Sequence, residues 1–278
     1  MASKKEPIIP KVLLEVKNPE KKDHEVWNKG RDLMNFIRPF RWMVTGNPNC
    51  GKSSAILNYL IRAKPGFSRI FLLHPRSYDP QVPDADQKMN KNLICESCEI
   101  PEYDGVEYFA LKYLPTEQFY VGLKGFSCLI IDDIDLQTYT RRVAFRQRVV
   151  NKTLSYCSTH NNLTVILTSQ SPTTQLPNIC FSMANVITLF GLKDKYKIRV
   201  LGQKLSFDSK QLIYYMQQLK SSHDNITFDL TLNSPMPIRL NMYEDVPEYV
   251  EPTKNENKKK KENVESDGGE QVYIWQNI

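Results

Sequence analysis

The chain has 278 residues, 41% of them hydrophobic, and a formal net charge of +6. This length suits one α/β domain with tails, and the hydrophobic fraction supports a substantial core, which argues against a wholly disordered protein. The sequence contains neither a run of 18 apolar residues nor a hydrophobic signal core, so we expect no membrane partner. Six cysteines without a disulfide framework suit a reducing compartment.

Composition divides the chain into three regions. Residues 1–30 are rich in lysine, contain three prolines and have no sustained period, which predicts a basic N-terminal arm. Residues 31–245 carry the periodic apolar segments of the predicted domain. Residues 246–278 predict a flexible C-terminal tail, with a lysine run suited to nuclear import or phosphate binding and an apolar end. That end is expected either to dock on the core of its own chain or to hook onto a partner.

The first elements surround a glycine-punctuated turn. We expect a helix or turn at residues 26–36, a buried strand at residues 41–45 and a helix at residues 53–61. The apolar face of that helix comprises Ile56, Leu57, Leu60 and Ile61.

Between this strand and helix, residues 46–53 (GNPNCGKS) match G-x-x-x-x-G-K-[ST] at every fixed position. Backbone amides of such a turn and the positive end of the helix bind a phosphate, the lysine reaches the β- and γ-phosphates, and the serine hydroxyl ligates Mg²⁺. ATP and Mg²⁺ are therefore the predicted ligands. The residues predicted to bind the nucleotide are Gly46, Asn49, Cys50, Gly51, Lys52, Ser53 and Ser54.

A second strand is predicted at residues 68–74, followed by a long polar stretch at residues 76–105. Cys95 and Cys98 in this stretch have the spacing of half a zinc site, but no second pair follows them. A short strand at residues 106–111 and a helix at residues 115–123 complete this part of the chain.

A buried strand that begins at residue 127 runs into three acids. Asp132 is predicted to bind the hydration shell of Mg²⁺, and Asp133 to orient or deprotonate the attacking water. Asp133 is one methylene shorter than the glutamate usual at this place, so Asp135 is the alternative base.

Residues 138–152 are predicted to form a basic helix, with five basic groups in its last twelve positions. Arg141, Arg148 and Lys152 fall near one face, and Arg142 and Arg146 on the adjacent one. The helix is either solvated, or faces DNA, or presents an arginine finger to the ATP of the next subunit. Arg142 and Arg146 are the predicted fingers.

The next buried strand, at residues 162–169, ends at Gln170. An amide both donates and accepts hydrogen bonds, so Gln170 is predicted to sense the γ-phosphate or hold the water, with a plain solvent-facing position as the alternative. Further strands are expected at residues 185–190, 226–232 and 237–243, with an amphipathic helix at residues 207–220 between the first two.

This set of motifs, from the phosphate loop through the acid-tipped strand to Gln170, resembles the FtsK/HerA class of P-loop ATPases. Within that class it is most similar to the genome-packaging ATPases of adenoviruses and related double-stranded DNA viruses and elements, over about residues 38–243. The resemblance implies a P-loop NTPase three-layer sandwich with a mostly parallel central sheet, flanked here by disordered basic tails. It also implies an oligomeric ring that drives DNA into a preformed capsid by ATP hydrolysis.

The predicted function is thus an ATP-driven double-stranded DNA translocase that packages a viral genome. Its expected partners are double-stranded DNA, further copies of the chain and a capsid or portal-vertex protein. Its expected location is the virion and the host nucleus, or a cytoplasmic viral factory. A superfamily 3 helicase is the first alternative, disfavoured by the 80 residues between Lys52 and Asp132 and by glutamine rather than asparagine at position 170. A DNA-binding assembly protein that binds nucleotide without turnover is the second.

Overall fold

The computed structural model describes residues 31–32, 34–64, 66–75, 106–191, 194–231, 233–246 and 249. The chain divides into two units, Met1–Asp245 and Val246–Ile278, and all helices and strands below belong to the first. The predicted arm, the stretch with Cys95 and Cys98, and nearly all of the C-terminal tail lie outside the described residues, so they stay predictions. Within the described ranges no helix is both long and apolar enough to span a bilayer.

A nine-stranded sheet in the order β3-β2-β4-β5-β1-β6-β7-β8-β9 forms the middle of the first unit. Strands β3 to β6 in this order are parallel to their neighbours, and β7, β8 and β9 continue the sheet antiparallel. The strands are β1 Arg41–Thr45, β2 Arg69–Leu73, β3 Glu107–Leu111, β4 Ser127–Ile131, β5 Leu163–Ser169, β6 Val186–Phe190, β7 Asn225–Asp229, β8 Ile238–Leu240 and β9 Glu244–Asp245.

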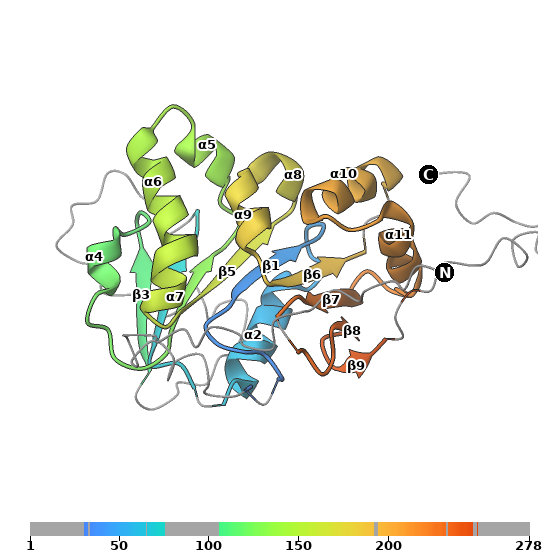
Figure 1. Cartoon of the computed structure of the whole chain (residues 1–278), viewed down its shortest axis with the longest axis horizontal. Coiled ribbons are helices and arrows are strands. Elements are labelled where there is room, and N and C mark those ends of the chain that lie inside the picture. Colours follow the sequence, from blue (N-terminus) through green and yellow to red (C-terminus); the bar gives the residue numbers. More distant parts are fainter. Residues whose placement is uncertain are drawn as a thin grey trace, which may run out of the picture. The chain divides into compact units, whose positions relative to one another are not determined.

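Helices cover both faces of the sheet (Figure 1). Helix α2 lies on one face, whereas α7 contacts β5 and α9 contacts β1 on the other. The predicted three-layer α/β fold with a mostly parallel central sheet is therefore confirmed. The helices are α2 Lys52–Arg62, α4 Glu117–Tyr120, α5 Leu136–Thr140, α6 Ala144–Lys152, the π-helix η1 Thr153–Cys157, α7 Ser158–His160, α8 Pro172–Gln175, α9 Asn178–Met183, α10 Lys195–Leu205 and α11 Ser209–Gln217.

The core beneath α2 is aromatic. Phe36, Phe40, Trp42 and Tyr59 are all fully buried, with neighbouring ring centroids 5.2 to 6.4 Å apart. The indole N–H of Trp42 donates to Thr188 Oγ1 at 2.8 Å, so burial leaves this donor satisfied. This packing fixes β1, and with it the start of the phosphate loop, against α2.

The buried face of α2 differs slightly from the predicted one. Ala55, Ile56, Tyr59 and Leu60 are buried, whereas Leu57 and Ile61 are only partly buried. The face is turned because Tyr59 joins the aromatic core.

The basic segment at residues 138–152, predicted as one helix, forms two helices. The prediction that Arg142 and Arg146 share one helix face is therefore wrong. Helix α5 ends at Thr140 and α6 begins at Ala144, with Arg142 in the left-handed region at φ 59°. Arg141 and Arg142 therefore lie in the turn between α5 and α6 rather than beside Arg146 on a helix. The Arg146 guanidinium lies 4.9 Å from the centre of the Tyr139 ring, a contact that holds the two helices in a hairpin.

For residues 26–36 we expected a helix or a turn, and the described part is a turn closed by a bridge between Arg31 and Ile37, with Asn35 at a φ of 60°. Helix α10 was not predicted, since four of its eleven residues are basic and, of those whose burial is described, only Ile198, Leu201 and Gly202 are buried. The predicted helices at residues 115–123 and 207–220 are present as the shorter α4 and α11.

A buried ionic network ties the segment before β1 to β7 and β8. Arg239, which is 1% exposed, donates to Asp229 Oδ2 at 2.9 Å and to the carbonyl oxygen of Met34 at 2.5 Å. Arg31 also lies 3.2 Å from Asp229 Oδ2. The network thus joins segments about 200 residues apart and closes the antiparallel end of the sheet.

Asp32 anchors the same segment to α2. Its Oδ1 accepts from the amides of Met34 and Phe36 at 2.9 and 3.0 Å, and its Oδ2 accepts from the Tyr59 hydroxyl at 3.0 Å. Burial raises the pKa of this carboxyl above its ordinary value of 3.8, outweighing the hydrogen bonds and the nearby Arg38, which lower it. Folding therefore favours the protonated form of Asp32.

Asp32→Asn is expected to reduce the fall in stability with rising pH. A raised pKa in the folded state gives a contribution that is complete below pH 3.8 and is lost as the pH rises through the folded pKa. The amide keeps an oxygen for both backbone donors but does not titrate. Urea unfolding at pH 4, 5.5 and 7 should show the variant gaining stability relative to the natural chain as the pH rises. A constant difference across this range would contradict the assignment.

Candidate nucleotide site

The phosphate loop connects β1 to α2 with the backbone that the motif requires. Gly51 at φ 102° and Asn49 at φ 58° adopt left-handed conformations that curl the chain. At Gly46 the requirement is space, since a Cβ there would lie 2.5 Å from Phe190 Cβ and 2.7 Å from Cys50 Sγ. The loop therefore packs directly on the end of β6, and the two motif glycines are needed for different reasons.

Lys52 and the start of α2 present the groups that a phosphate needs. Lys52 Nζ folds over the loop and donates to the carbonyl oxygens of Gly46 and Asn47 at 3.0 and 2.9 Å. Ser53 and Ser54 are exposed in the first turn of α2, which contains no acidic side chain. The positive helix end and the ammonium group thus fit a polyphosphate, and the Ser53 hydroxyl is placed to serve as a metal ligand.

Cys50 fills the space beneath the loop. Its side chain is buried against Gly46, and burial raises the pKa of the thiol although the charge of Lys52 opposes the rise. The side chain therefore stays a neutral filler under the loop.

The acid-tipped strand reaches the same edge of the sheet, but not directly beside the phosphate loop. Strand β5 lies between β1, which leads into the loop, and β4, which leads into the acids. Thr45 pairs with Ser169, and Ile131 pairs with Leu167. Because the three strands are parallel and nearly in register, their carboxyl ends meet at one edge, with Gln170 in the middle.

A threonine that was not predicted from the sequence joins the side chain of Asp132 to the backbone of Asp133. The Thr168 hydroxyl donates to Asp132 Oδ1 at 2.6 Å and accepts from the amide of Asp133 at 2.8 Å. Asp132 Oδ2 lies 3.8 Å from His74 Nε2, so β2 also contributes to this cluster. In the sequence, the signal for Thr168 was a hydroxyl in an apolar strand, two positions before Gln170. The signal for His74 was a polar residue directly after an apolar strand.

Asp133 has one carboxylate oxygen that is hydrogen-bonded and one that is buried and unpaired. Its backbone is left-handed at φ 54°, a conformation that aspartate tolerates better than most residues. The Gln170 amide donates to Oδ2. Oδ1 is buried and has no hydrogen-bond partner among the residues that the structure describes. An oriented carboxylate with an unpaired oxygen fits a proton acceptor, and the structure brings it together with Gln170.

Asp135, the alternative base, has a structural role instead. It is the N-cap of α5, where Oδ1 accepts from the amide of Thr138 at 2.8 Å and Oδ2 from the Thr138 hydroxyl at 2.7 Å. The geometry therefore favours Asp133 over Asp135 as the base.

The two predicted arginine fingers lie in different environments. Arg142 is exposed in the turn of the α5–α6 hairpin. Arg146 is partly buried, packs on the Tyr139 ring and donates to the carbonyl oxygen of Tyr139 at 3.4 Å. Their role in a neighbouring subunit stays a prediction, with Arg142 the more accessible of the two.

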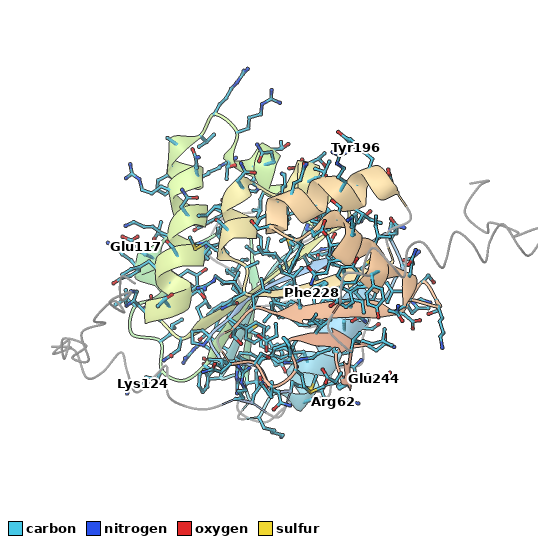
Figure 2. All side chains as sticks on the ribbon, turned by 45° about the vertical axis from the view of Figure 1, so that its right-hand side comes forward. Arg62, Glu117, Lys124, Tyr196, Phe228 and Glu244 are labelled. Atoms are coloured by element: carbon cyan, nitrogen blue, oxygen red, sulfur yellow. The ribbon has the colours of Figure 1, made fainter. Side chains whose placement is uncertain are left out.

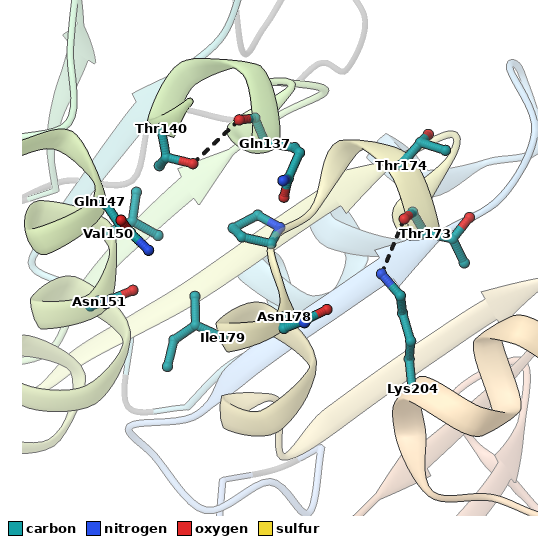
Figure 3. Close-up of a pocket in the computed structure, with 11 residues that line it drawn as sticks. Gln137, Thr140, Gln147, Val150, Asn151, Thr173, Thr174, Asn178, Ile179 and Lys204 are labelled. Carbon is teal, nitrogen blue, oxygen red and sulfur yellow. Dashed lines mark hydrogen bonds between the residues drawn. The ribbon is translucent and has the colours of Figure 1, made fainter. Parts of the chain in front are cut away.

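A polar pocket of about 620 Å³ opens between the α5–α6 hairpin and helices α8, α9 and α10 (Figure 3). Two of its walls continue directly from the candidate site, because α5 follows Asp135 and α8 begins two residues after Gln170. Lys204 crosses one side and donates to the carbonyl oxygen of Thr173 at 3.0 Å. The lining residues are Gln137, Thr140, Gln147, Val150, Asn151, Thr173, Thr174, Pro177, Asn178, Ile179 and Lys204.

No protein-family model matches the chain, and no curated protein matches it. Solved structures with a similar arrangement include the genome packaging NTPase B204 of Sulfolobus turreted icosahedral virus 2 in complex with ATP-gammaS. It is 17% identical with a TM-score of 0.47, and the match covers 74% of this chain and 98% of that one.

Two further structures are similar at the same level. The DNA-packaging ATPase B204 from Sulfolobus turreted icosahedral virus is 16% identical, with a TM-score of 0.49 and coverage of 76% of this chain and 100% of that one. The pCW3 conjugation coupling protein TcpA, with ATPgS, is 13% identical, with a TM-score of 0.46 and coverage of 76% and 61%. At these identities the functional assignment rests on the geometry of the site.

Proposed function

We propose that the protein is an ATPase. One observation supports this most: Asp133 has an unpaired Oδ1 at the same sheet edge as the phosphate loop. A phosphate loop alone suits any nucleotide-binding protein. An oriented proton acceptor two strands away from it suits hydrolysis of the bound triphosphate.

The chain's own groups divide the work of binding. The loop amides and Lys52 hold the phosphates, while the Ser53 hydroxyl and Asp132 supply the oxygen ligands that Mg²⁺ prefers. Bound there, Mg²⁺ would offset phosphate charge. The Thr168 hydroxyl orients the Asp132 carboxylate, so this ligand is positioned before any metal arrives, and His74 Nε2 lies 3.8 Å from its other oxygen.

Hydrolysis then needs a positioned water and a place for its proton. The water oxygen attacks the γ-phosphorus, the bond from that phosphorus to the bridging oxygen of ADP breaks, and Asp133 Oδ1 accepts the water proton. The Gln170 amide keeps the carboxylate aimed by holding Oδ2. Lys52 stabilises the charge that moves onto the leaving group.

We propose double-stranded DNA as the polymer on which this ATPase acts. Exposed basic residues gather on the α5–α6 hairpin and on α10: Arg141, Arg142, Arg148, Lys197 and Arg199. Two exposed aromatic side chains, Phe145 at 61% and Tyr196 at 74%, accompany them. Figure 2 shows Tyr196 at the upper edge of the molecule, with Lys124 and Arg62 at the lower edge. A basic surface beside the catalytic edge suits the phosphate backbone of a duplex.

The finer role that we propose is packaging of a viral genome into a preformed capsid, supported by the resemblance of the motif set to viral packaging ATPases. This role implies a ring of copies in which Arg142 or Arg146 reaches the ATP of the next subunit. It also implies a capsid or portal-vertex partner, and a location in the virion and the host nucleus or a cytoplasmic viral factory.

Linear double-stranded DNA is expected to stimulate ATP turnover by the full chain, and Lys197→Gln combined with Arg199→Gln should weaken this response. Each lost phosphate contact lowers the slope of log affinity against log salt by about one. Turnover and DNA affinity would be measured at several salt concentrations. Lys64→Gln with Lys124→Gln removes the same charge from other exposed sites and is the matched control.

Each result of this experiment bears on one part of the proposal. If ATP is not turned over with or without DNA, the chain is no ATPase. If the rate of ATP hydrolysis is the same with and without DNA at low salt, the proposed DNA translocase function is wrong. If the control pair weakens DNA binding as much as the α10 pair, the DNA surface has been misplaced.

A further inference from the structure

The loop at residues 218–224 joins α11 to β7. It lies beside the phosphate loop, although the two loops are about 170 residues apart in the sequence. Strand β7 is antiparallel to β6, and Phe190 at the end of β6 pairs with Asn225 at the start of β7. The loop before Asn225 therefore reaches the same sheet edge as the phosphate loop. A Cβ built on Gly51 would lie 3.7 Å from His223 Nδ1 and 3.5 Å from Phe190 Cε1.

Local hydrogen bonds hold the backbone of this loop. Asp224 Oδ2 accepts from the amides of Lys220 and Ser221, both at 2.9 Å, and these bonds help to lower the pKa of Asp224. The amide of His223 donates to Ser221 Oγ at 3.2 Å. The backbone of His223 is thus fixed at the site while its side chain stays exposed.

The strand order gives the direction in which a bound nucleotide must run. Strands β4 and β5, with Asp133 and Gln170 at their ends, lie on one side of β1, and β6 and β7 lie on the other. The γ-phosphate has to face Asp133 for hydrolysis. The α-phosphate and the nucleoside therefore extend toward β6 and β7, where His223 stands beside Gly51.

We propose that His223 contacts the ribose of the bound nucleotide, an inference that rests on the proposed ATPase function. An imidazole at this position donates or accepts a hydrogen bond with a ribose hydroxyl. The contact selects nucleoside di- and triphosphates over inorganic polyphosphate. Lys52, by contrast, contacts groups that all these ligands share.

His223→Ala is expected to weaken binding of MgATP and MgADP by the full chain about two- to tenfold, the size typical of a lost hydrogen bond between neutral groups. Binding of magnesium tripolyphosphate should stay unchanged, since that ligand has no nucleoside. Titration calorimetry measures all three. Ser222→Ala, at the neighbouring exposed position, is the matched control, and His223→Gln should recover part of the affinity because its amide also donates.

The outcomes separate this inference from the proposed function. Unchanged ATP affinity in His223→Ala would overturn the contact, and so would an equal loss of ATP and tripolyphosphate binding, which would place the histidine at the shared phosphates. A natural chain that binds ATP through His223 yet never hydrolyses it would leave the contact standing and refute the ATPase. A natural chain that binds no nucleotide would refute both.

Discussion

Replacement of Asp133 by Asn is expected to lower the rate of ATP hydrolysis by about 10²- to 10⁴-fold, the range for losing a general base. The amide retains the shape of the side chain but does not accept the water proton. ATP binding should be nearly unaffected, because the groups that hold the phosphates belong to the loop between β1 and α2. The measurement is single-turnover hydrolysis at saturating ATP, with affinity determined separately.

The fold should tolerate this substitution. Asparagine, like aspartate, is among the residues enriched in the left-handed region that position 133 occupies at φ 54°. The bond from the backbone amide to the Thr168 hydroxyl does not involve the changed group. Asp133→Asn therefore tests chemistry with little change in stability, and a melting temperature close to that of the natural chain verifies this.

Asp135→Asn is the matched control, since it makes the same chemical change two residues away. Asparagine caps a helix about as well as aspartate, so α5 keeps its N-cap and both the stability and the chemical step should change little. Loss of turnover in this variant alone would identify Asp135 as the base. Unaltered turnover in Asp133→Asn, with DNA still bound, would favour the protein that binds nucleotide without hydrolysis.

Lys52→Ala is expected to have the second large effect, with ATP affinity falling about 10- to 100-fold and hydrolysis at saturation falling by about 10²- to 10³-fold. The ammonium group contacts the phosphates in the ground state and stabilises the charge that develops as the γ-phosphoryl group leaves. Both the dissociation constant and the saturated rate should therefore change, unlike the pattern for Asp133→Asn.

The control for Lys52→Ala is Lys64→Ala, which removes an exposed lysine just beyond the C-terminal end of α2. It should leave affinity and rate unchanged. The carbonyl groups of Gly46 and Asn47 lose this donor in Lys52→Ala, so the unfolding of the variant is measured beside its affinity and rate. Normal ATP affinity in Lys52→Ala would show that the nucleotide does not sit in this loop.

Much of the fold could be read from local patterns. Continuous apolar runs such as residues 127–131 predicted buried parallel strands because a sheet covered on both faces needs apolar side chains on both. The phosphate loop was equally clear, since its glycines, lysine and serine are adjacent in the chain. The prediction of a single basic helix was wrong because no glycine or proline marks the break at Arg142. The hairpin is held instead by the contact of Arg146 with Tyr139.

By itself the sequence determined what depends on neighbours along the chain: the strands, the turn built to hold a phosphate, and the acids at a strand end. Only the tertiary structure decided that β5 lies between the loop and those acids and that Thr168 links Asp132 to Asp133. It also decided that Asp133 rather than Asp135 keeps an unpaired carboxylate oxygen. It also placed His223 beside Gly51. Each of these depends on pairing or hydrogen bonding between segments far apart in sequence, which local patterns of polarity and turn residues do not encode.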